Sequence, residues 1–250
     1  MASAAAENPA ASDASAARAA ITVIAAHPAL EHSRITRRLM DAAAGVGAAP
    51  DGPAVDVRDL YHLYPDYFID VAAEQAALGA AQLVVWLQPI HWYSMPPLMK
   101  LWLDEVFAFG WAYGPGGTAL RGKDLWLVAS TGGPEHSYHP AGYNRYFFDA
   151  YLPPYEQTAR LAGMRWLPPL VLHGAHRVDE AGLGAHAGLF AERLRQWPEW
   201  PELEDLEPAA ACEVPADARP APGGEPAPAA APALHGARQV RRTARDAHGP

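Results

Sequence analysis

The stretch LVVWLQPIHWYSMPPLMKLWLDEVFAFG, residues 83–110, decides the fold class. Residues 83–90 form an almost unbroken apolar run, which is typical of a strand buried on both faces of a sheet. Pro96 and Pro97 open the segment that closes on Gly110, and proline is tolerated only in the first turn of a helix. The stretch therefore predicts a buried strand, a short aromatic and polar connection, and a helix.

The same alternation continues along the chain. Further strand-like runs lie at 21–26, 54–60, 124–133 and 166–174, and helical segments lie at 33–45, 70–81, 143–163 and 179–197, the third of them interrupted at Pro153 and Pro154. Parallel strands need crossover connections, which are usually helices. We therefore expect an α/β fold, a doubly wound five-stranded parallel sheet with helices on both faces and the flavodoxin-like order 2-1-3-4-5.

Composition limits the classes of function. The formal net charge is −9, and the first 200 residues hold no block of Lys and Arg, so nucleic-acid binding is not expected. No apolar run reaches the roughly 18–20 residues of a membrane span, and residues 1–19 lack the features of a signal peptide. The single cysteine, Cys212, has no disulfide partner, which indicates a reducing, cytoplasmic compartment.

The ends of the chain differ from the middle. Residues 1–19 are rich in alanine, and residues 202–250 are rich in proline and alanine with few large apolar side chains. Such segments bury too little surface to offset the entropy lost on ordering. We predict a disordered extension at 1–19, one doubly wound, flavodoxin-like domain at 20–201, and a disordered tail at 202–250.

Polar residues gather where the predicted strands end. In doubly wound sheets, ligands bind outside the carboxyl ends of the strands. HPALEHS follows the first strand, with Ser33 as candidate N-cap and Arg34 and Thr36 as further donors at a helix start that favours an anion. The alternative for this stretch is that Ser33 is only an N-cap and His27 only a turn residue.

Two other connections should meet the first at this edge. Trp92 and Tyr93 offer flat faces that suit a planar heterocycle, although aromatic side chains also fill cores and interfaces. The STGG of residues 130–133 offers backbone amides that suit an oxygen gaining charge, or forms an ordinary strand-end turn. A phosphate anchor, an aromatic wall and an amide-lined end together match the shape of flavin mononucleotide.

Other motifs are rejected. GTALRGKD (117–124) has Walker A spacing, but it has Asp124 where Ser or Thr is required and precedes a strand. GPGGTA (114–119) follows a helix, which excludes a dinucleotide fingerprint. HSYH and HGAH lack the further ligands of a metal site, and no G-x-S-x-G elbow is present. We expect no metal.

The quoted motifs also carry a resemblance. Five groups of motifs occur in the order found in flavodoxin-like NAD(P)H quinone oxidoreductases. They are AHP with HS, LYHLYPDYFIDVAAEQAAL, QPIHWYSMPPLMKLWLDEVFAFGWAYGPGGTALRGKDL, STGG and LAGMRWLPPLVLHG. Within them, the chain resembles the KefF/KefG-type ancillary proteins of glutathione-regulated potassium-efflux systems. The likeness covers about residues 20–198 and is most specific across 60–125.

The resemblance implies particular site residues. Thr36 stands where related proteins often have Asn, and His91 where they often have Gln. Tyr138, with His136 and His139 as alternatives, occupies a place where related reductases carry a tyrosine near the flavin. The flavin-binding positions that the resemblance implies are His27, Ser33, Arg34, Ile35, Thr36, Ile90, His91, Trp92, Tyr93, Ser130, Thr131, Gly132 and Gly133.

The resemblance implies a function as well. The cofactor would be FMN rather than FAD, with NAD(P)H as co-substrate and a quinone as acceptor in a two-electron, ping-pong reaction. It further implies a homodimer and a membrane potassium/proton antiporter as partner, which would place the protein at the cytoplasmic face of the inner membrane. A generic FMN reductase or azoreductase is one alternative, and a chiefly regulatory subunit with structural flavin is another.

Overall fold

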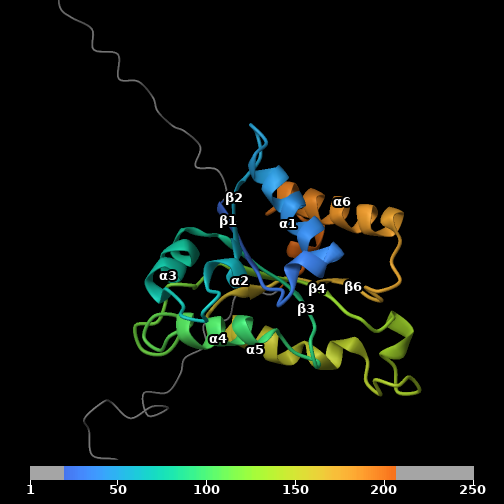
Figure 1. Cartoon of the computed structure of the whole chain (residues 1–250). Coiled ribbons are helices and arrows are strands. Elements are labelled where there is room, and N and C mark those ends of the chain that lie inside the picture. The colour runs from blue at the N-terminus through green and yellow to red at the C-terminus, as the bar shows by residue number, and fades with distance from the viewer. Residues whose placement is uncertain (1–19, 207–250) are drawn as a thin grey trace, which may run out of the picture. The chain divides into compact units, whose positions relative to one another are not determined.

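The computed structural model describes residues 20–206 (Figure 1). Residues 1–19 and 207–250, for which the composition predicts disorder, lie outside the described residues. The strands are β1 (Ala20–Ala25), β2 (Ala54–Asp59), β3 (Leu83–Pro89), β4 (Asp124–Ser130), β5 (Arg165–Trp166) and β6 (Leu170–Leu172). The α-helices are α1 (Arg34–Gly47), α2 (Leu60–Leu63), α3 (Val71–Ala80), α4 (Pro97–Val106), α5 (Pro153–Leu161) and α6 (Glu180–Gln196).

The sheet is parallel and has the predicted winding. Its order is β2-β1-β3-β4-β5. Both β5 and β6 pair with β4: β5 pairs with its first residues and β6 with its last three. The predicted fifth strand is therefore two short strands, because Pro168 and Pro169 cannot donate ladder hydrogen bonds and separate β5 from β6. β3 and β4 are buried along their whole length, as central strands covered on both faces should be.

Two helical layers cover the sheet (Figure 1). α1 and α6 lie on one face, and their buried side chains pack with those of Ile21, Val85 and Trp126. α2, α3, α4 and α5 lie on the other face, around Trp86 and Trp102. Among the helices within residues 20–206, none has both the length and the apolar content needed to cross a bilayer.

Three boundaries differ from the sequence prediction. α4 ends at Val106, before the predicted Gly110, and Pro153 and Pro154 open α5 at its first turn, where proline fits, instead of interrupting it. The folded part also extends past residue 201. Leu203 is buried against the α6 side of the core, so the first residues of the predicted disordered tail are packed.

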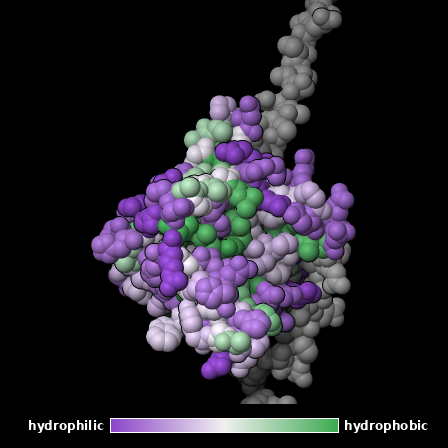
Figure 2. Space-filling model, turned by 90° about the vertical axis from the view of Figure 1, so that its right-hand side faces the viewer, coloured by the Kyte–Doolittle hydropathy of each residue, from purple (hydrophilic) through white to green (hydrophobic). Residues whose placement is uncertain are grey.

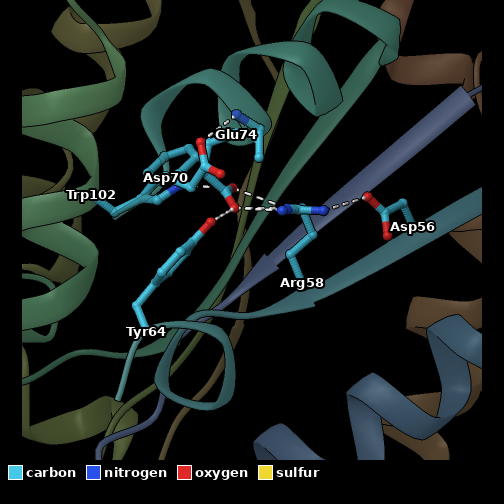
Figure 3. Close-up of polar contacts among 7 residues, drawn as sticks. Asp56, Arg58, Tyr64, Asp70, Glu74 and Trp102 are labelled. Carbon is cyan, nitrogen blue, oxygen red and sulfur yellow. Dashed lines mark hydrogen bonds and ion pairs between the residues drawn. The ribbon is translucent and has the colours of Figure 1, made fainter. Parts of the chain in front are cut away.

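A buried carboxylate ties α3 to the strand β2 and the helix α4. Glu74 is fully buried, and Figure 3 shows three donors converging on it. The Arg58 Nε–H donates to both carboxylate oxygens at 3.0 Å, the Trp102 Nε1–H donates at 2.9 Å, and the Tyr64 hydroxyl donates to Oε1. Burial raises the pKa of Tyr64 to about 12. Since Trp102 lies on α4, the cluster also positions the helix that follows residues 91–96.

Candidate functional site

A cavity of about 830 Å³ lies at the carboxyl ends of β1, β3 and β4. This volume is within the range of about 300–1,000 Å³ that is typical of small-molecule and cofactor sites. Figure 2 views the side of the molecule on which α6 starts, and hydrophobic residues gather at its centre within a hydrophilic rim. The lining residues are His27, Pro28, His32, Ser33, Arg34, Ile35, Pro89, Ile90, His91, Trp92, Pro97, Ser130, Gly132, Ala175 and His176.

The start of α1 forms one end of the cavity. Ser33 is the N-cap, and its Oγ accepts the Thr36 N–H at 3.1 Å. Because the oxygen acts as acceptor, the hydroxyl hydrogen stays available for another group. The Arg34 and Ile35 amides belong to the first turn, which has no intrahelical acceptors. This end of the cavity therefore suits an anion.

The Arg34 guanidinium does not face this end of the cavity as a free donor. It donates to the Val178 carbonyl at 3.2 Å and forms an ion pair with Glu180 at the start of α6. Arg38 pairs with the same carboxylate at 3.1 Å. The prediction of Arg34 as a phosphate donor thus applies to its backbone amide, while its side chain joins α1 to α6.

Two histidines lie side by side in the wall. The rings of His27 and His91 are 6.1 Å apart and roughly perpendicular. The His27 Nδ1 accepts the Ala29 N–H at 3.2 Å, which orients the ring. Burial lowers the pKa of both imidazoles, and the proximity of His91 lowers that of His27 further. The two rings are therefore neutral at neutral pH, and the wall is polar without being charged.

Four histidines make the stability of the fold pH-dependent. Burial lowers the pKa of His27, His91, His173 and His186 in the folded protein. As pH falls through the unfolded value of about 6.5, the unfolded chain gains protons that the folded chain excludes, so stability falls. We expect a lower urea midpoint at pH 5.5 than at pH 7.5, a window above the titration of ordinary carboxylates. An equal or higher midpoint at pH 5.5 would contradict this assignment.

Residues 91–94 form a tight turn. The His91 and Ser94 backbones exchange hydrogen bonds at 2.9 and 3.0 Å. Trp92 and Tyr93 have positive φ angles of 48° and 65°, as the central residues of a type I′ turn do. Each such non-glycine residue costs on the order of 1–3 kcal/mol and persists only where its surroundings enforce it.

Neighbouring groups hold this turn and display its tryptophan. Tyr93 stacks on Tyr151 at a ring distance of 5.0 Å, and its hydroxyl donates to the Asn144 Oδ1 at 3.2 Å. Trp92 is 93% exposed. Of the two aromatic residues predicted to contact a ligand ring, Trp92 lines the cavity, whereas Tyr93 packs against the segment that follows β4.

The 130–133 turn contributes Ser130 and Gly132 to the cavity lining, beside the connection that follows β3. The Ile90 N–H donates to the Ser130 carbonyl at 2.8 Å, which joins the two connections. A Cβ on Gly132 would lie 3.3 Å from the His176 Nε2, and one on Gly133 would lie 2.8 Å from the Tyr143 hydroxyl and 2.9 Å from the Ser137 Oγ. A side chain at either glycine would therefore have to displace the ends of these neighbouring side chains.

The proposed proton donors lie outside the cavity lining. Tyr138 is buried, with Phe148 and His173 at ring distances of 5.3 Å. Burial raises its pKa, and a side-chain hydrogen bond with Thr131 opposes the shift. His139 packs edge-on against Phe147 and its Nδ1 accepts the Ala141 N–H, and His136 is exposed.

Most of the residues predicted to bind the cofactor line this one cavity, but the sequence did not predict the part of the lining that follows β6. Thr36, Tyr93, Thr131 and Gly133 support the turns without lining the cavity. The missed wall includes Ala175 and His176, which follow β6. The rule that placed the other loops also applies to this strand end, but HGAH had been considered only as a metal-binding pair. Within residues 20–206, no group of three or more His, Cys, Asp or Glu is placed to hold a metal ion.

Comparisons with known proteins agree with this architecture. A family model described as flavodoxin-like fold matches residues 19–194. The glutathione-regulated potassium-efflux system ancillary protein KefF of Citrobacter koseri is 46% identical over 179 residues, which cover 72% of this chain and 97% of that protein. This chain belongs to the KefF family of flavodoxin-like proteins.

Solved structures share the fold of this KefF-family chain. A thermophilic tryptophan halogenase from Streptomycin violaceusniger is 39% identical, with a TM-score of 0.63 over 68% of this chain and 96% of its own. General stress protein 14 of Treponema denticola, in complex with FMN, is 34% identical, with a TM-score of 0.62 over 72% and 97%. A putative quinone reductase of Klebsiella pneumoniae is 26% identical, with a TM-score of 0.62 over 72% and 85%. Since these names differ in activity, the feature common to all three is the fold.

Proposed function

We propose that this protein is an FMN-dependent NAD(P)H:quinone oxidoreductase. The observation that carries the proposal is the single cavity in which a helix start, an apolar and aromatic wall and a glycine turn converge at the carboxyl edge of the sheet. The FMN complex of the Treponema denticola relative and the quinone reductase name of the Klebsiella pneumoniae relative support it.

The residues present fit a flavin mononucleotide. The phosphate would bind at the first turn of α1, where Ser33 offers a hydroxyl hydrogen and Arg34 and Ile35 offer amides. The ring would lie between Ile90 and Trp92 on one side and Gly132 on the other, because Gly132 adds no side chain to the cavity. FMN is proposed over FAD because the Treponema denticola relative is an FMN complex.

When bound, the flavin would supply two-electron exchange between NAD(P)H and a quinone. The chain itself would orient the ring with the 91–94 and 130–133 turns and stabilise developing negative charge with backbone amides of the glycine turn. Among Tyr138, His136 and His139, Tyr138 stays our candidate proton donor, because its side chain bonds Thr131 of the glycine turn, whereas His136 and His139 are exposed. A Tyr138→Phe variant is expected to lose quinone turnover about 100-fold or more while keeping flavin, and full turnover would remove the role.

The central experiment is spectroscopic. The purified full chain, reconstituted with FMN if necessary, is expected to show oxidised-flavin absorbance that NAD(P)H bleaches and a quinone restores. A protein that cannot be reconstituted with FMN would contradict flavin binding. A protein that binds FMN but transfers no electrons to quinones would contradict the activity alone.

The phosphate site has a separate test. Ser33→Ala should weaken FMN binding about tenfold, since a hydrogen bond to a charged group contributes about 1.5–3 kcal/mol, and should leave the affinity for riboflavin, which has no phosphate, nearly unchanged. Isothermal titration with both ligands measures the difference. Loss of the N-cap lowers stability by about 1 kcal/mol, so both titrations are run well below the melting temperature. Equal losses for the two ligands would refute a phosphate at α1.

We further propose a role as an ancillary subunit of a potassium-efflux antiporter at the cytoplasmic face of the inner membrane. The KefF name of the relative from Citrobacter koseri supports it. A variant that binds flavin but cannot turn over should still activate efflux if the role is regulatory. If this variant no longer activates efflux, the enzymatic activity itself would regulate the antiporter.

A homodimer is part of the same proposal. Trp92 is 93% exposed at the mouth of the cavity, and Tyr146 and Phe147 are also exposed. Large aromatic side chains are enriched in protein interfaces, so a second copy that covers Trp92 would remove this surface from water. Sedimentation equilibrium is expected to give a dimer that Trp92→Asp weakens, and a monomer at all concentrations would contradict the proposal.

A further inference from the structure

Two segments far apart in the sequence are joined at the cavity edge. The Thr131 N–H donates to the Leu172 carbonyl at 2.9 Å, and the Ala175 N–H donates to the Thr131 carbonyl at 2.8 Å. The Gly174 N–H donates to the Gly133 carbonyl at 2.9 Å. The glycine turn is therefore held on one side by the segment that follows β6.

A side chain of that segment reaches back to the turn. The His173 Nδ1 lies 2.9 Å from the Thr131 Oγ1, and the same hydroxyl donates to the Gly133 carbonyl at 2.8 Å. A hydroxyl has a single hydrogen and two lone pairs. The Gly133 carbonyl can only accept, so with the hydroxyl hydrogen placed there the contact with His173 is a hydrogen bond when the histidine Nδ1 carries a hydrogen.

The hydrogen bond between His173 and Thr131 needs one tautomer of the imidazole when the ring is the donor. The ring packs edge-on against Phe148 at 5.0 Å and tilted against Tyr138 at 5.3 Å. Burial lowers its pKa, which the charge of Glu135 partly opposes. A neutral imidazole has only one N–H, so a neutral ring that donates to Thr131 carries its hydrogen on Nδ1 and leaves Nε2 without one.

We propose that His173 is a positioning residue, whose Nδ1–H holds the Thr131 hydroxyl and thereby keeps the 131–133 turn in the conformation that lines the cofactor cavity. The inference rests on the proposed flavin function. His173 acts through Thr131, which is 1% exposed and whose hydroxyl also bonds the Gly133 carbonyl and the Tyr138 side chain. No proton leaves the ring in this role.

The tautomer can be measured without cofactor. Nitrogen NMR of the flavin-free full chain, with His173 assigned by comparison with a His173→Asn sample, is expected to show the Nδ1–H form at pH 7.5. This form is the minor one for free histidine in water, so its dominance would reflect the bond to Thr131. A dominant Nε2–H form would overturn the proposal.

A pair of isosteric variants tests the positioning role. The amide nitrogen of His173→Asn replaces the Nδ1–H donor, whereas that of His173→Gln falls at the place of Nε2. We expect FMN affinity to fall about tenfold in His173→Gln, the effect of one lost hydrogen bond, and to stay within about twofold of wild type in His173→Asn. The reduction potential of the bound flavin should likewise shift only in the Gln variant.

The outcomes separate the two proposals. Equal affinities and potentials for the Asn and Gln variants in a flavin-loaded protein would overturn the role of His173 alone. A wild-type chain without affinity for FMN would overturn the proposed function, and with it the cofactor part of this inference. Thermal unfolding of both variants checks that each is folded, and a purely structural role would lower their melting temperatures without separating their flavin potentials.

Discussion

Glu74→Ala is expected to lower the free energy of unfolding by about 3–5 kcal/mol, because removing one partner of a buried ion pair strands the other. Glu74 is fully buried, and the Arg58 side chain is only 18% exposed. The substitution would leave the Arg58 charge and the Trp102 and Tyr64 donors without their common acceptor. Equilibrium unfolding in urea, followed by tryptophan fluorescence, measures the loss.

An exposed ion pair provides the matched control. Lys100 and Asp104 lie one turn apart on α4, with both side chains more than half exposed. Asp104→Ala should cost less than about 0.5 kcal/mol. The double variant Arg58→Met with Glu74→Leu should recover only part of the stability, because it removes both charges together but leaves the Trp102 and Tyr64 donors without an acceptor. A loss below 1 kcal/mol for Glu74→Ala would show that the cluster does not hold α3 in place.

Gly132→Val is expected to weaken flavin binding by roughly five- to hundredfold, which corresponds to the roughly 1–3 kcal/mol of an overpacked site. A Cβ at this position would lie 3.3 Å from the His176 Nε2, and the branched side chain would add further atoms to the cavity wall. The quenching of flavin fluorescence on titration with apoprotein measures the affinity.

Two variants show whether the effect is steric and local. Gly132→Ala combined with His176→Ala should bind flavin better than Gly132→Ala alone, since the atom that a Cβ would meet is gone. Gly79→Val on α3 is the control for glycine substitution, because a Cβ there meets nothing within 4 Å. It should leave flavin affinity unchanged. Unaltered affinity in Gly132→Val would mean that the ring does not lie against this turn.

The sequence predicted the architecture because the signals for it are local. The apolar run at 83–90 and the proline pair at 96–97 each report on a neighbourhood of a few residues, and β3 and α4 lie where they indicate. Ser33 was expected as an N-cap, and its side chain accepts an amide hydrogen in the first turn of α1. The parallel winding then followed from the need for crossover helices.

The composition of the cavity wall was predictable only where a strand end pointed to it. His27, Ser33, Ile90, Trp92 and Gly132 follow strands that the apolar runs had already located, and all line the cavity. The wall that follows β6 was missed although the apolar run at 166–174 ends there. The HGAH stretch at this strand end was weighed only as a metal-binding pair, so the rule of strand ends was not applied to it.

By itself, the sequence determined the order of strands and helices, the helix caps and the edge of the sheet where polar loops meet. Only the tertiary structure decided that the Arg34 guanidinium turns to Glu180, that Tyr93 stacks on Tyr151, and that His173 reaches Thr131. The reason is that a helix, strand or cap is selected by interactions within a few residues, whereas these contacts join residues 42 to 146 positions apart. Such partners meet only after the sheet has formed, and no local pattern records which of several polar groups at one edge will pair.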